Sequence, residues 1–213
     1  MRLPSRLYAI LDRSVSRDRD LPELLEAVLA GGCRLVQLRE KTLSLADLLP
    51  LAQRLVRRCR EVGALLIVND RADLALAAGA DGLHVGQDDL PARQARAQLR
   101  PGMILGVSTH DPDQARRAVA DGADYVAVGS IFPTTTKVGF QLVGPELIRR
   151  VRAEIPVPLV AIGGITAENA PSVLEAGADA VAVISALCAA ADPEAATRAF
   201  LARIAPGAVG PGR

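Results

Sequence analysis

The sequence predicts an α/β protein that forms a single (β/α)8 TIM barrel, and two observations favour this fold class. Eight short apolar runs recur along the chain, with amphipathic stretches between them. Each run has four to five residues and lacks the polar alternation of a half-exposed strand, as expected for parallel strands covered by helices. An open doubly wound sheet would use the same elements, but it seldom repeats them at so even a spacing. The barrel is therefore the better interpretation.

Each apolar run is an expected strand. The runs are Leu7–Leu11, Leu35–Leu38, Leu65–Val68, Gly82–Val85, Ile104–Val107, Tyr125–Val128, Leu159–Ile162 and Ala180–Ile184. The clearest expected helices are Leu21–Ala30, Leu45–Glu61, Pro112–Asp121 and Ala167–Glu175. Three of the strands follow a Gly-Ala-Asp segment, at 79–81, 122–124 and 177–179. We interpret these glycines as structural, because glycine ends a helix in the left-handed conformation at little cost.

Length and composition bound the domain and its partners. The 213 residues fit one catalytic barrel over residues 1–205, and the Gly- and Pro-rich residues 206–213 are expected to be a flexible tail. Lys and Arg number 25 against 24 Asp and Glu, and aromatic residues make up 2%, so neither a nucleic acid nor a membrane is an expected partner. Exposed apolar helix faces could support a homo-oligomer.

Cysteine usage and the N-terminus predict a cytoplasmic protein. The three cysteines are widely spaced and odd in number, so they give no disulfide framework and are expected as buried thiols in a reducing compartment. The first residues carry no signal-peptide cleavage site, and no apolar stretch reaches 18 residues.

Polar residues follow the apolar runs, at the strand ends where a barrel carries its chemistry. The segments that follow the second to eighth runs are 37–41, 69–70, 84–89, 108–110, 129–137, 163–166 and 184–185. The turns at the opposite end carry little beyond Gly-Ala-Asp. We therefore expect the site at the carboxyl ends of the strands.

Two of these strand ends supply carboxylates. Asp70 and either Asp89 or Asp88 come from neighbouring strands, and hard carboxylate oxygens with room for water suit Mg²⁺ better than Zn²⁺. Alternatively, Asp88 or Asp89 caps the helix expected to start near Pro91.

Phosphate groups are the expected ligands of three further segments. Arg39 and Lys41 point toward the same mouth and could clamp a diphosphate. The threonine-rich run that ends in Lys137 joins hydroxyls and backbone N–H groups to one cation. Gly163-Gly164, before a helix expected to open at Thr166, and Ile184-Ser185 place backbone amides at two helix starts, the usual phosphate site of such barrels.

The only two histidines carry no settled role. His84 lies inside the fourth expected strand, and a packed or hydrogen-bonded structural role is the better interpretation. His110 could act as a base, but the Asp111-Pro112 that follows it is equally well explained as a helix start. No serine nucleophile with a partner base is evident.

The strings VQLREK (36–41), VND (68–70), GLHVGQDD (82–89), GVS (106–108), TTTK (134–137) and IGGI (162–165) together resemble the thiamine phosphate synthase family. The resemblance runs from about Leu7 to Leu187. It implies a Mg²⁺-dependent transferase that condenses 4-amino-2-methyl-5-hydroxymethylpyrimidine diphosphate with 4-methyl-5-(2-phosphoethyl)thiazole, or its carboxylated form, to give thiamine phosphate and diphosphate. Two segments depart from the usual pattern: Tyr8-Ala9-Ile10-Leu11-Asp12, where the family more often ends in Thr-Asp, and the short Val138–Gly144.

The resemblance also implies roles for residues. Asp70 and Asp89 are the implied Mg²⁺ ligands. The residues implied to hold the pyrimidine diphosphate are Gln37, Arg39, Lys41 and Asn69. Ser108 and Lys137 are implied on the diphosphate and pyrimidine side, and with Arg39 and Lys41 they form the expected catalytic set. The residues implied to hold the thiazole phosphate are Thr134, Thr136, Gly164, Ile184 and Ser185.

The implied reaction is dissociative. An electron-rich aminopyrimidine expels diphosphate, and the thiazole nitrogen captures the resulting methylene cation, so no general base is needed. Two alternatives remain. A thiazole tautomerase-like barrel would isomerise a thiazole carboxylate, with His110 as its only candidate base. A non-catalytic phosphate-ligand-binding barrel would not need two carboxylates beside a diphosphate clamp. Another phosphate-binding isomerase or aldolase would want a base or a Schiff-base lysine that we cannot nominate.

Overall fold

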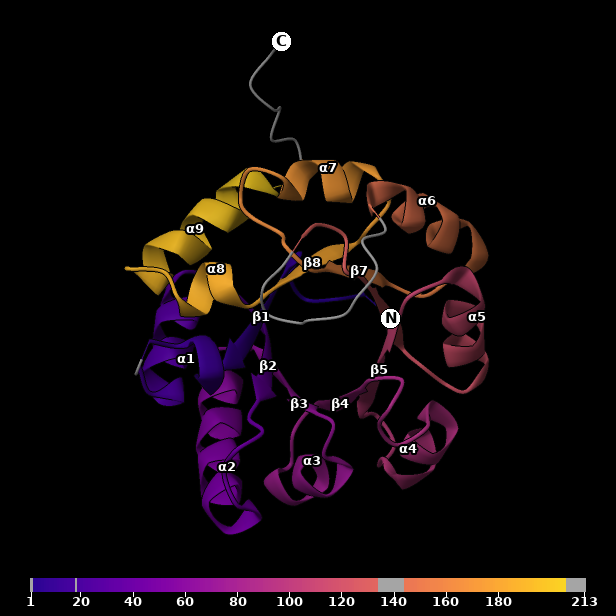
Figure 1. Ribbon diagram of the computed structural model, residues 1–213. Helices are drawn as coiled ribbons and strands as arrows, with labels where there is room; N and C mark the ends of the chain where they lie inside the picture. The colour runs from indigo at the N-terminus through magenta and orange to yellow at the C-terminus, as the bar shows by residue number, and fades with distance from the viewer. Residues whose placement is uncertain (1, 18, 134–143, 206–213) are drawn as a thin grey trace.

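The computed structural model describes residues 2–17, 19–133 and 144–205, and these form a closed parallel barrel (Figure 1). Each strand pairs with the next one along the chain, and β8 pairs with β1, so the sheet has no free edge. The helices surround the strands (Figure 1). The predicted fold class is confirmed. In the described part of the chain, no helix is long and apolar enough to cross a membrane.

Eight strands alternate with the helices along the chain. The strands are β1 (Leu7–Asp12), β2 (Leu35–Arg39), β3 (Leu65–Asn69), β4 (Gly82–Val85), β5 (Ile104–Thr109), β6 (Tyr125–Val128), β7 (Leu159–Ile162) and β8 (Ala180–Val183). The helices are η1 (Arg13–Val15), α1 (Leu21–Ala30), α2 (Leu45–Glu61), α3 (Ala72–Ala78), α4 (Ala92–Gln98), α5 (Pro112–Ala120), α6 (Gly144–Glu154), α7 (Ala170–Glu175), α8 (Ser185–Cys188) and α9 (Pro193–Arg203).

Most predicted bounds hold within two residues, and the clearest difference is the start of α7. The sequence places a helix start at Thr166, whereas α7 begins at Ala170. The Asn169 side chain accepts a hydrogen bond from the Thr166 N–H at 2.9 Å and donates one to the Gly164 carbonyl at 3.0 Å. These bonds hold 164–169 as a turn, so the helix starts after it.

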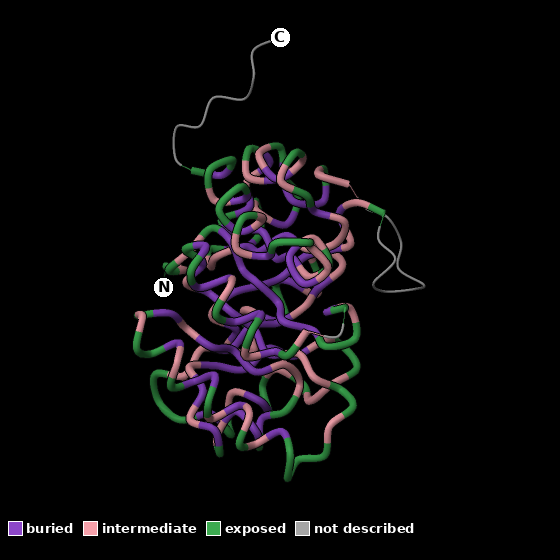
Figure 2. The backbone as a smooth tube through the Cα atoms, turned by 90° about the vertical axis from the view of Figure 1, so that its left-hand side faces the viewer, coloured by how far each residue is buried: buried purple, intermediate pink, exposed green. Residues whose placement is uncertain are grey.

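Two apolar layers hold the barrel together. The outer layer lies between strands and helices, where leucine, valine and alanine side chains of both pack together. The inner layer fills the barrel and includes Tyr8, Ile10, Ile67 and Tyr125. Buried residues accordingly follow the strands through the middle of the molecule, and exposed residues lie on the outside (Figure 2). The burial of both strand faces explains why the strands lack polar alternation.

The ring of helices closes where α9 packs against α1 (Figure 1). At the end of α1, a Cβ on Gly31 would lie 2.5 Å from Cβ of Thr197 on α9, which is closer than packed atoms allow. Thr197 is fully buried at this contact, and its hydroxyl donates to the Pro193 carbonyl at 2.7 Å. The missing side chain at Gly31 therefore permits the two helices to approach and complete the ring.

The aspartates of the Gly-Ala-Asp segments join neighbouring strands at the amino ends of the barrel. Asp124 accepts a hydrogen bond from the Leu105 N–H at 2.8 Å and an ion-paired bond from Arg96 at 2.9 Å. Asp81 and Asp179 accept in the same way from the amides of Leu66 and Leu159, both at 2.8 Å. The glycines of the motif were predicted to be structural, and its aspartates join the strands as well.

Replacing Asp124 with Ala should destabilise the barrel without touching the site, because the Leu105 N–H loses its charged acceptor. We expect a loss of about 1.5–3 kcal/mol in the free energy of unfolding, measured by urea denaturation. Glu61→Ala is the control: Glu61 is an exposed carboxylate paired with Arg58 at 3.0 Å. Its loss should stay within about 0.5 kcal/mol. Equal losses in the two variants would contradict the strand-joining role of the motif.

Candidate active site

Polar side chains gather at the carboxyl ends of the strands and divide into two regions. We call the first region the charged half-site; it lies at the ends of β1 to β4 and consists of Asp12, Arg39, Lys41, Asn69, Asp70 and Asp89. We call the second the neutral cavity; it has a volume of about 540 Å³ and lies at the ends of β5 to β8. Ser108, at the end of β5, lines the neutral cavity and faces His84 of β4, so it lies where the two regions meet.

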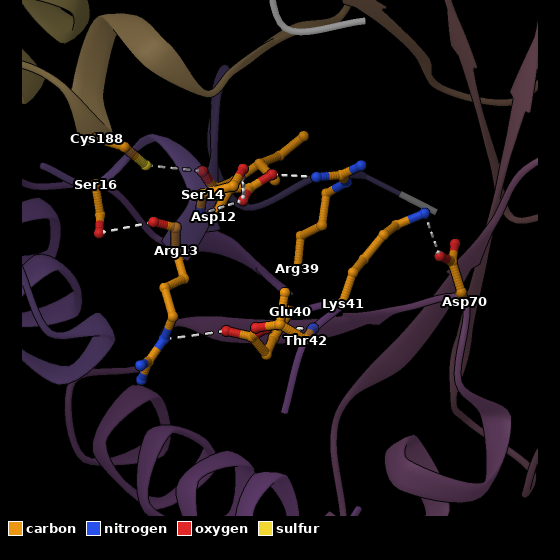
Figure 3. Close-up of polar contacts among 11 residues, drawn as sticks. Asp12, Arg13, Ser14, Ser16, Arg39, Glu40, Lys41, Thr42, Asp70 and Cys188 are labelled. Atoms are coloured by element: carbon orange, nitrogen blue, oxygen red, sulfur yellow. Dashed lines mark hydrogen bonds and ion pairs between the residues drawn. The ribbon is translucent and has the colours of Figure 1, made fainter. Parts of the chain in front are cut away.

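Asp12 fixes the position of Arg39 in the charged half-site (Figure 3). The Asp12 carboxylate is 3% exposed and accepts a hydrogen bond from a guanidinium N–H of Arg39. Its other oxygen accepts from the backbone N–H of Ser14 at 2.9 Å and from the Ser14 hydroxyl at 2.6 Å. With its oxygens held by three donors, Asp12 presents Arg39 in one orientation at the mouth of the barrel.

Glu40 stands between Arg39 and Lys41 in the sequence, but its side chain points away from the mouth (Figure 3). Its Oε1 accepts from the Thr42 N–H at 2.6 Å and from the Leu43 N–H at 3.3 Å, and its Oε2 lies 3.1 Å from Nε of Arg13. Glu40 therefore shapes the loop after β2 and leaves its neighbours Arg39 and Lys41 directed at the mouth.

Asp70 brings a carboxylate from β3 against one from the loop after β4. Its backbone is left-handed, with φ of 61°, a conformation that aspartate adopts more readily than most residues. The Asp70 N–H donates to the His84 carbonyl at 2.8 Å, and its carboxylate pairs with the Lys41 ammonium at 3.2 Å (Figure 3). The same carboxylate contacts that of Asp89.

Asp88 and Asp89 differ in their surroundings. Asp89 is half-buried, contacts Asp70 and accepts a hydrogen bond from the Gly86 N–H at 2.8 Å. Asp88 is exposed. Neither caps α4, whose N-cap is Pro91 and whose start has no side-chain cap bond. The capping alternative is therefore wrong, and Asp89 is the residue that meets Asp70.

The contact between the two carboxyls shifts their pKa values in opposite directions. Burial, with the neighbouring Asp89 carboxyl, raises the pKa of Asp70 above its usual value. Burial would raise the pKa of Asp89 too, but hydrogen bonds from the Asp70 carboxyl and the Gly86 N–H outweigh it and the pKa is lowered. Two carboxylates in contact repel each other when both are ionised, so the pair favours a proton or a cation close to it.

The neutral cavity is lined by backbone and small side chains. Its lining residues are Ser108, Thr109, His110, Ala127, Gly129, Ser130, Pro133, Ile162 to Thr166 and Ala182 to Ala186. At Gly164, which has φ of 62°, an added Cβ would lie 2.4 Å from the Pro133 carbonyl oxygen. Backbone therefore forms this wall, and the short helix α8 starts at the other side, next to Ile184.

His110 lies between a helix start and the neutral cavity. The following Asp111 caps α5 by accepting from the Gln114 N–H at 2.7 Å, so the helix-start interpretation is confirmed. The His110 ring also lines the neutral cavity, and its Nδ1 lies 2.7 Å from the Gly129 carbonyl oxygen. Because a carbonyl oxygen only accepts, Nδ1 carries a hydrogen.

The structure brings most of the expected site residues to this rim. Arg39, Lys41, Asn69, Asp70 and Asp89 come together in the charged half-site, and Ser108, Gly164, Ile184 and Ser185 line the neutral cavity. Gln37 lies deeper, 2% exposed inside the barrel, where its amide nitrogen donates to the Tyr8 hydroxyl at 2.8 Å. Thr134, Thr136 and Lys137 lie outside the described residues.

Three residues of the site were not nominated from the sequence. Asp12 ends the first strand as other polar residues end the later ones, so the strand-end rule was the signal that points to it. Tyr8 and Tyr125 were counted only as members of apolar runs. Their signal is rarity, because they are the only tyrosines of the chain.

A closed barrel with a carboxylate pair, oriented cations and an adjoining cavity at its catalytic rim defines the chain as a (β/α)8-barrel enzyme. A family model described as thiamine monophosphate synthase matches residues 7–187. The chain is 49% identical over 181 residues to a thiamine-phosphate synthase of Chlorobium luteolum, covering 84% of this chain and 85% of the relative. It is also 49% identical over 193 residues to one from Moorella thermoacetica, covering 90% and 92%.

Structural similarity agrees with the sequence relatives. The thiamine phosphate pyrophosphorylase of Pyrococcus furiosus superposes with a TM-score of 0.86 at 36% identity, covering 93% of this chain and 94% of that one. The chain belongs to the thiamine monophosphate synthase family.

Replacing Asp70 with Asn should stabilise the metal-free protein. A carboxyl whose pKa is raised on folding lowers stability as the pH rises from its unfolded pKa through its folded pKa, and the loss is complete above both. Asparagine removes this loss and tolerates the left-handed backbone. In EDTA we expect the variant to melt above the wild type at neutral pH, with the difference shrinking toward pH 4. A lower melting temperature at pH 7 would contradict the burial cost assigned to Asp70.

Proposed function

We propose that this enzyme condenses 4-amino-2-methyl-5-hydroxymethylpyrimidine diphosphate with 4-methyl-5-(2-phosphoethyl)thiazole, or its carboxylated form, to give thiamine phosphate and diphosphate; the carboxylated form also releases carbon dioxide. The observation that carries the proposal is the division of the mouth into a charged half-site and a neutral cavity that meet at Ser108. One region suits a diphosphate and the other a neutral ring with a phosphate tail. Family membership supports the same reaction.

The charged half-site contains carboxylates that suit Mg²⁺. Asp70 and Asp89 would hold the ion, since two hard carboxylates in contact favour a cation between them and leave positions for water and diphosphate oxygens. When bound, Mg²⁺ would neutralise the charge that develops on the departing diphosphate. Among the described residues no group of three or more His, Cys, Asp or Glu side chains surrounds a metal position, which agrees with a site completed by the substrate.

Arg39 and Lys41 would bind the diphosphate itself. Arg39, held by Asp12, offers a planar pair of donors that suits two phosphate oxygens at once. Lys41 is 56% exposed and paired with Asp70, so it can turn to the diphosphate when a metal ion takes that carboxylate. Gln37 and Asn69 would hold the pyrimidine, and Ser108 with Lys137 would contact the diphosphate where it leaves.

The neutral cavity would hold the thiazole phosphate. Gly164, Ile184 and Ser185 line it, and with Thr134 and Thr136 they would bind the phosphate through backbone N–H and hydroxyl groups. The ring nitrogen would then face the pyrimidine methylene carbon. The bond from that carbon to the diphosphate oxygen breaks with its electron pair, and the nitrogen lone pair forms the new carbon–nitrogen bond. No proton needs to move, so no base is required.

The barrel must also keep water from the methylene cation. The cavity floor is apolar, with Ala127 and Ala182 on the strands, and the interior beneath it is filled by side chains. A dry, positioned nucleophile about 3–3.5 Å from the carbon converts capture into an intramolecular step. We also propose a cytoplasmic location, supported by the free, buried thiols of Cys33, Cys59 and Cys188.

The reaction is tested by following diphosphate release from the pyrimidine diphosphate with Mg²⁺, with and without the thiazole phosphate, and detecting thiamine phosphate by mass spectrometry. We expect release that is coupled to product and abolished by EDTA. No release at any Mg²⁺ concentration would overturn the proposal. Isomerisation of a thiazole carboxylate without condensation would assign the tautomerase alternative, in which His110 of the neutral cavity is the candidate base.

Asp89→Asn and Asp88→Asn form a matched pair for the metal assignment. Asp89 contacts Asp70, whereas its neighbour Asp88 is exposed. We expect Asp89→Asn to lower kcat/KM by about 100-fold, because it removes a hard ligand of the ion that stabilises the leaving group. Asp88→Asn should remain within about twofold of wild type. Similar losses in both variants, measured by the release assay, would contradict the assignment of Asp89.

A further inference from the structure

Both tyrosines of the chain lie inside the barrel and touch each other. Tyr8 of β1 is 1% exposed and Tyr125 of β6 is fully buried, and their hydroxyl oxygens lie 2.9 Å apart. The rings meet edge to face, with centroids 6.0 Å apart. A barrel interior is normally filled by branched apolar side chains, so two hydroxyl groups at its centre need an explanation.

Strand register and a glycine leave room for Tyr125 beside His84. In the registers of β4, β5 and β6, His84 pairs with Gly106 and Gly106 pairs with Tyr125, so the three residues lie at one level. A Cβ on Gly106 would lie 2.0 Å from the Tyr125 ring, so any other residue there would displace it. Across the gap that Gly106 leaves, the rings of His84 and Tyr125 stack with centroids 5.6 Å apart.

A continuous run of hydrogen bonds passes through these rings and joins two site residues. The Gln37 amide nitrogen donates to the Tyr8 hydroxyl at 2.8 Å, and the Tyr8 hydroxyl bonds that of Tyr125. The Tyr125 hydroxyl lies 2.8 Å from Nδ1 of His84, and Nε2 of His84 lies 2.8 Å from Oγ of Ser108. We call these five residues the interior chain.

The direction of donation along the interior chain is set at its Gln37 end. A hydroxyl has one hydrogen, so Tyr8, which accepts from Gln37, donates to Tyr125, and Tyr125 donates to Nδ1 of His84. A neutral imidazole that accepts at Nδ1 carries its hydrogen on Nε2, and this hydrogen is donated to Ser108. The opposite direction would leave the Tyr8 hydrogen without an acceptor in the chain, at a cost of about 1–3 kcal/mol.

The Ser108 hydroxyl is consequently available as a donor. Its oxygen accepts from Nε2 of His84, so its own hydrogen is not used within the interior chain, and Ser108 lines the neutral cavity, where that hydrogen can be donated toward the mouth. We propose that Tyr8, Tyr125 and His84 are positioning residues that fix the donor state of Ser108 and the orientation of the Gln37 amide. The inference rests on the proposed function, in which Ser108 meets the departing diphosphate and Gln37 meets the pyrimidine.

A fixed donor matters for a dissociative step. Charge develops on the diphosphate oxygen as the carbon–oxygen bond breaks, and a hydroxyl already aimed there stabilises that charge without reorganising. A freely rotating serine would spend part of its time as an acceptor toward the mouth. Burial raises the pKa of both tyrosines above their usual value, so both hydroxyls keep their hydrogens throughout the pH range of an assay.

The tautomer of His84 tests the direction without any turnover. His110 is the only other histidine, and its Nδ1 donates to the Gly129 carbonyl, so the two histidines are expected in opposite tautomers. In ¹⁵N NMR of the ligand-free protein with labelled histidine, assigned with His110→Gln, His84 should show a protonated Nε2 and a bare Nδ1. A protonated Nδ1 on neutral His84 would overturn the proposal, whatever the enzyme proves to catalyse.

Two conservative variants test the effect on the reaction. Tyr125→Phe keeps the ring over Gly106 but removes the donor to Nδ1 of His84. The His84 tautomer, and with it the donor state of Ser108, is then no longer fixed. Tyr8→Phe removes an equally buried hydroxyl at the Gln37 end, yet leaves Tyr125 able to donate to His84. We expect Tyr125→Phe to lower kcat by about tenfold or more with little change in KM. Tyr8→Phe should mainly raise KM for the pyrimidine diphosphate.

The outcomes separate positioning from packing and from failure of the proposed function. In ¹⁵N NMR, Tyr125→Phe should lose the single His84 tautomer and Tyr8→Phe should keep it. Equal changes in kcat for the two variants, or a change only in melting temperature, would assign the tyrosines to packing and overturn the proposal. If wild type releases no diphosphate while His84 shows the expected tautomer, the proposed reaction fails and the direction of the interior chain stands.

Discussion

The pairing of β8 with β1 is the constraint on which the rest of the structure depends. It closes the sheet, removes both edges and brings residues from the two ends of the described chain to one rim. Asp12 follows from β1, and Ile184 and Ser185 follow from β8, so both halves of the mouth exist only in the closed barrel. The bonds of Asp81, Asp124 and Asp179 at the opposite end join neighbouring strands there. Stability and chemistry thus occupy opposite ends of the barrel.

The barrel interior carries polar groups where apolar side chains would stabilise it more simply. A buried hydroxyl without a partner costs about 1–3 kcal/mol, whereas a satisfied network costs little and admits one arrangement only. Gln37, Tyr8, Tyr125 and His84 satisfy one another, and the run ends at Ser108 on the rim. The floor of the site therefore determines which groups donate above it.

Strand bounds and the charged residues could be predicted from the sequence because both follow simple rules. Continuous apolar runs predict buried parallel strands, and polar residues after them predict the rim. Contacts across the barrel follow no such rule. Tyr8 and Tyr125 are separated by 117 residues and meet only because strand register places them at compatible levels. The same register explains why residue 106 must be glycine, since any side chain there would meet the Tyr125 ring. The turn before α7 depends on the Asn169 side chain.

The charged half-site pairs its own groups when no ligand neutralises them. Arg39 lies against Asp12 and Lys41 against Asp70, and the Asp89 carboxyl beside Asp70 raises the pKa of that residue. Unpaired charges in a partly desolvated mouth are costly, so each pairing lowers the free energy of the empty site. The Asp12–Arg39 and Lys41–Asp70 pairs differ in how firmly they are held. Asp12 is buried with three donors and holds Arg39 as a fixed part of the wall. The Lys41 pair is exposed and weak, so the proposed metal ion would replace Lys41 at Asp70 and leave the ammonium available to a diphosphate.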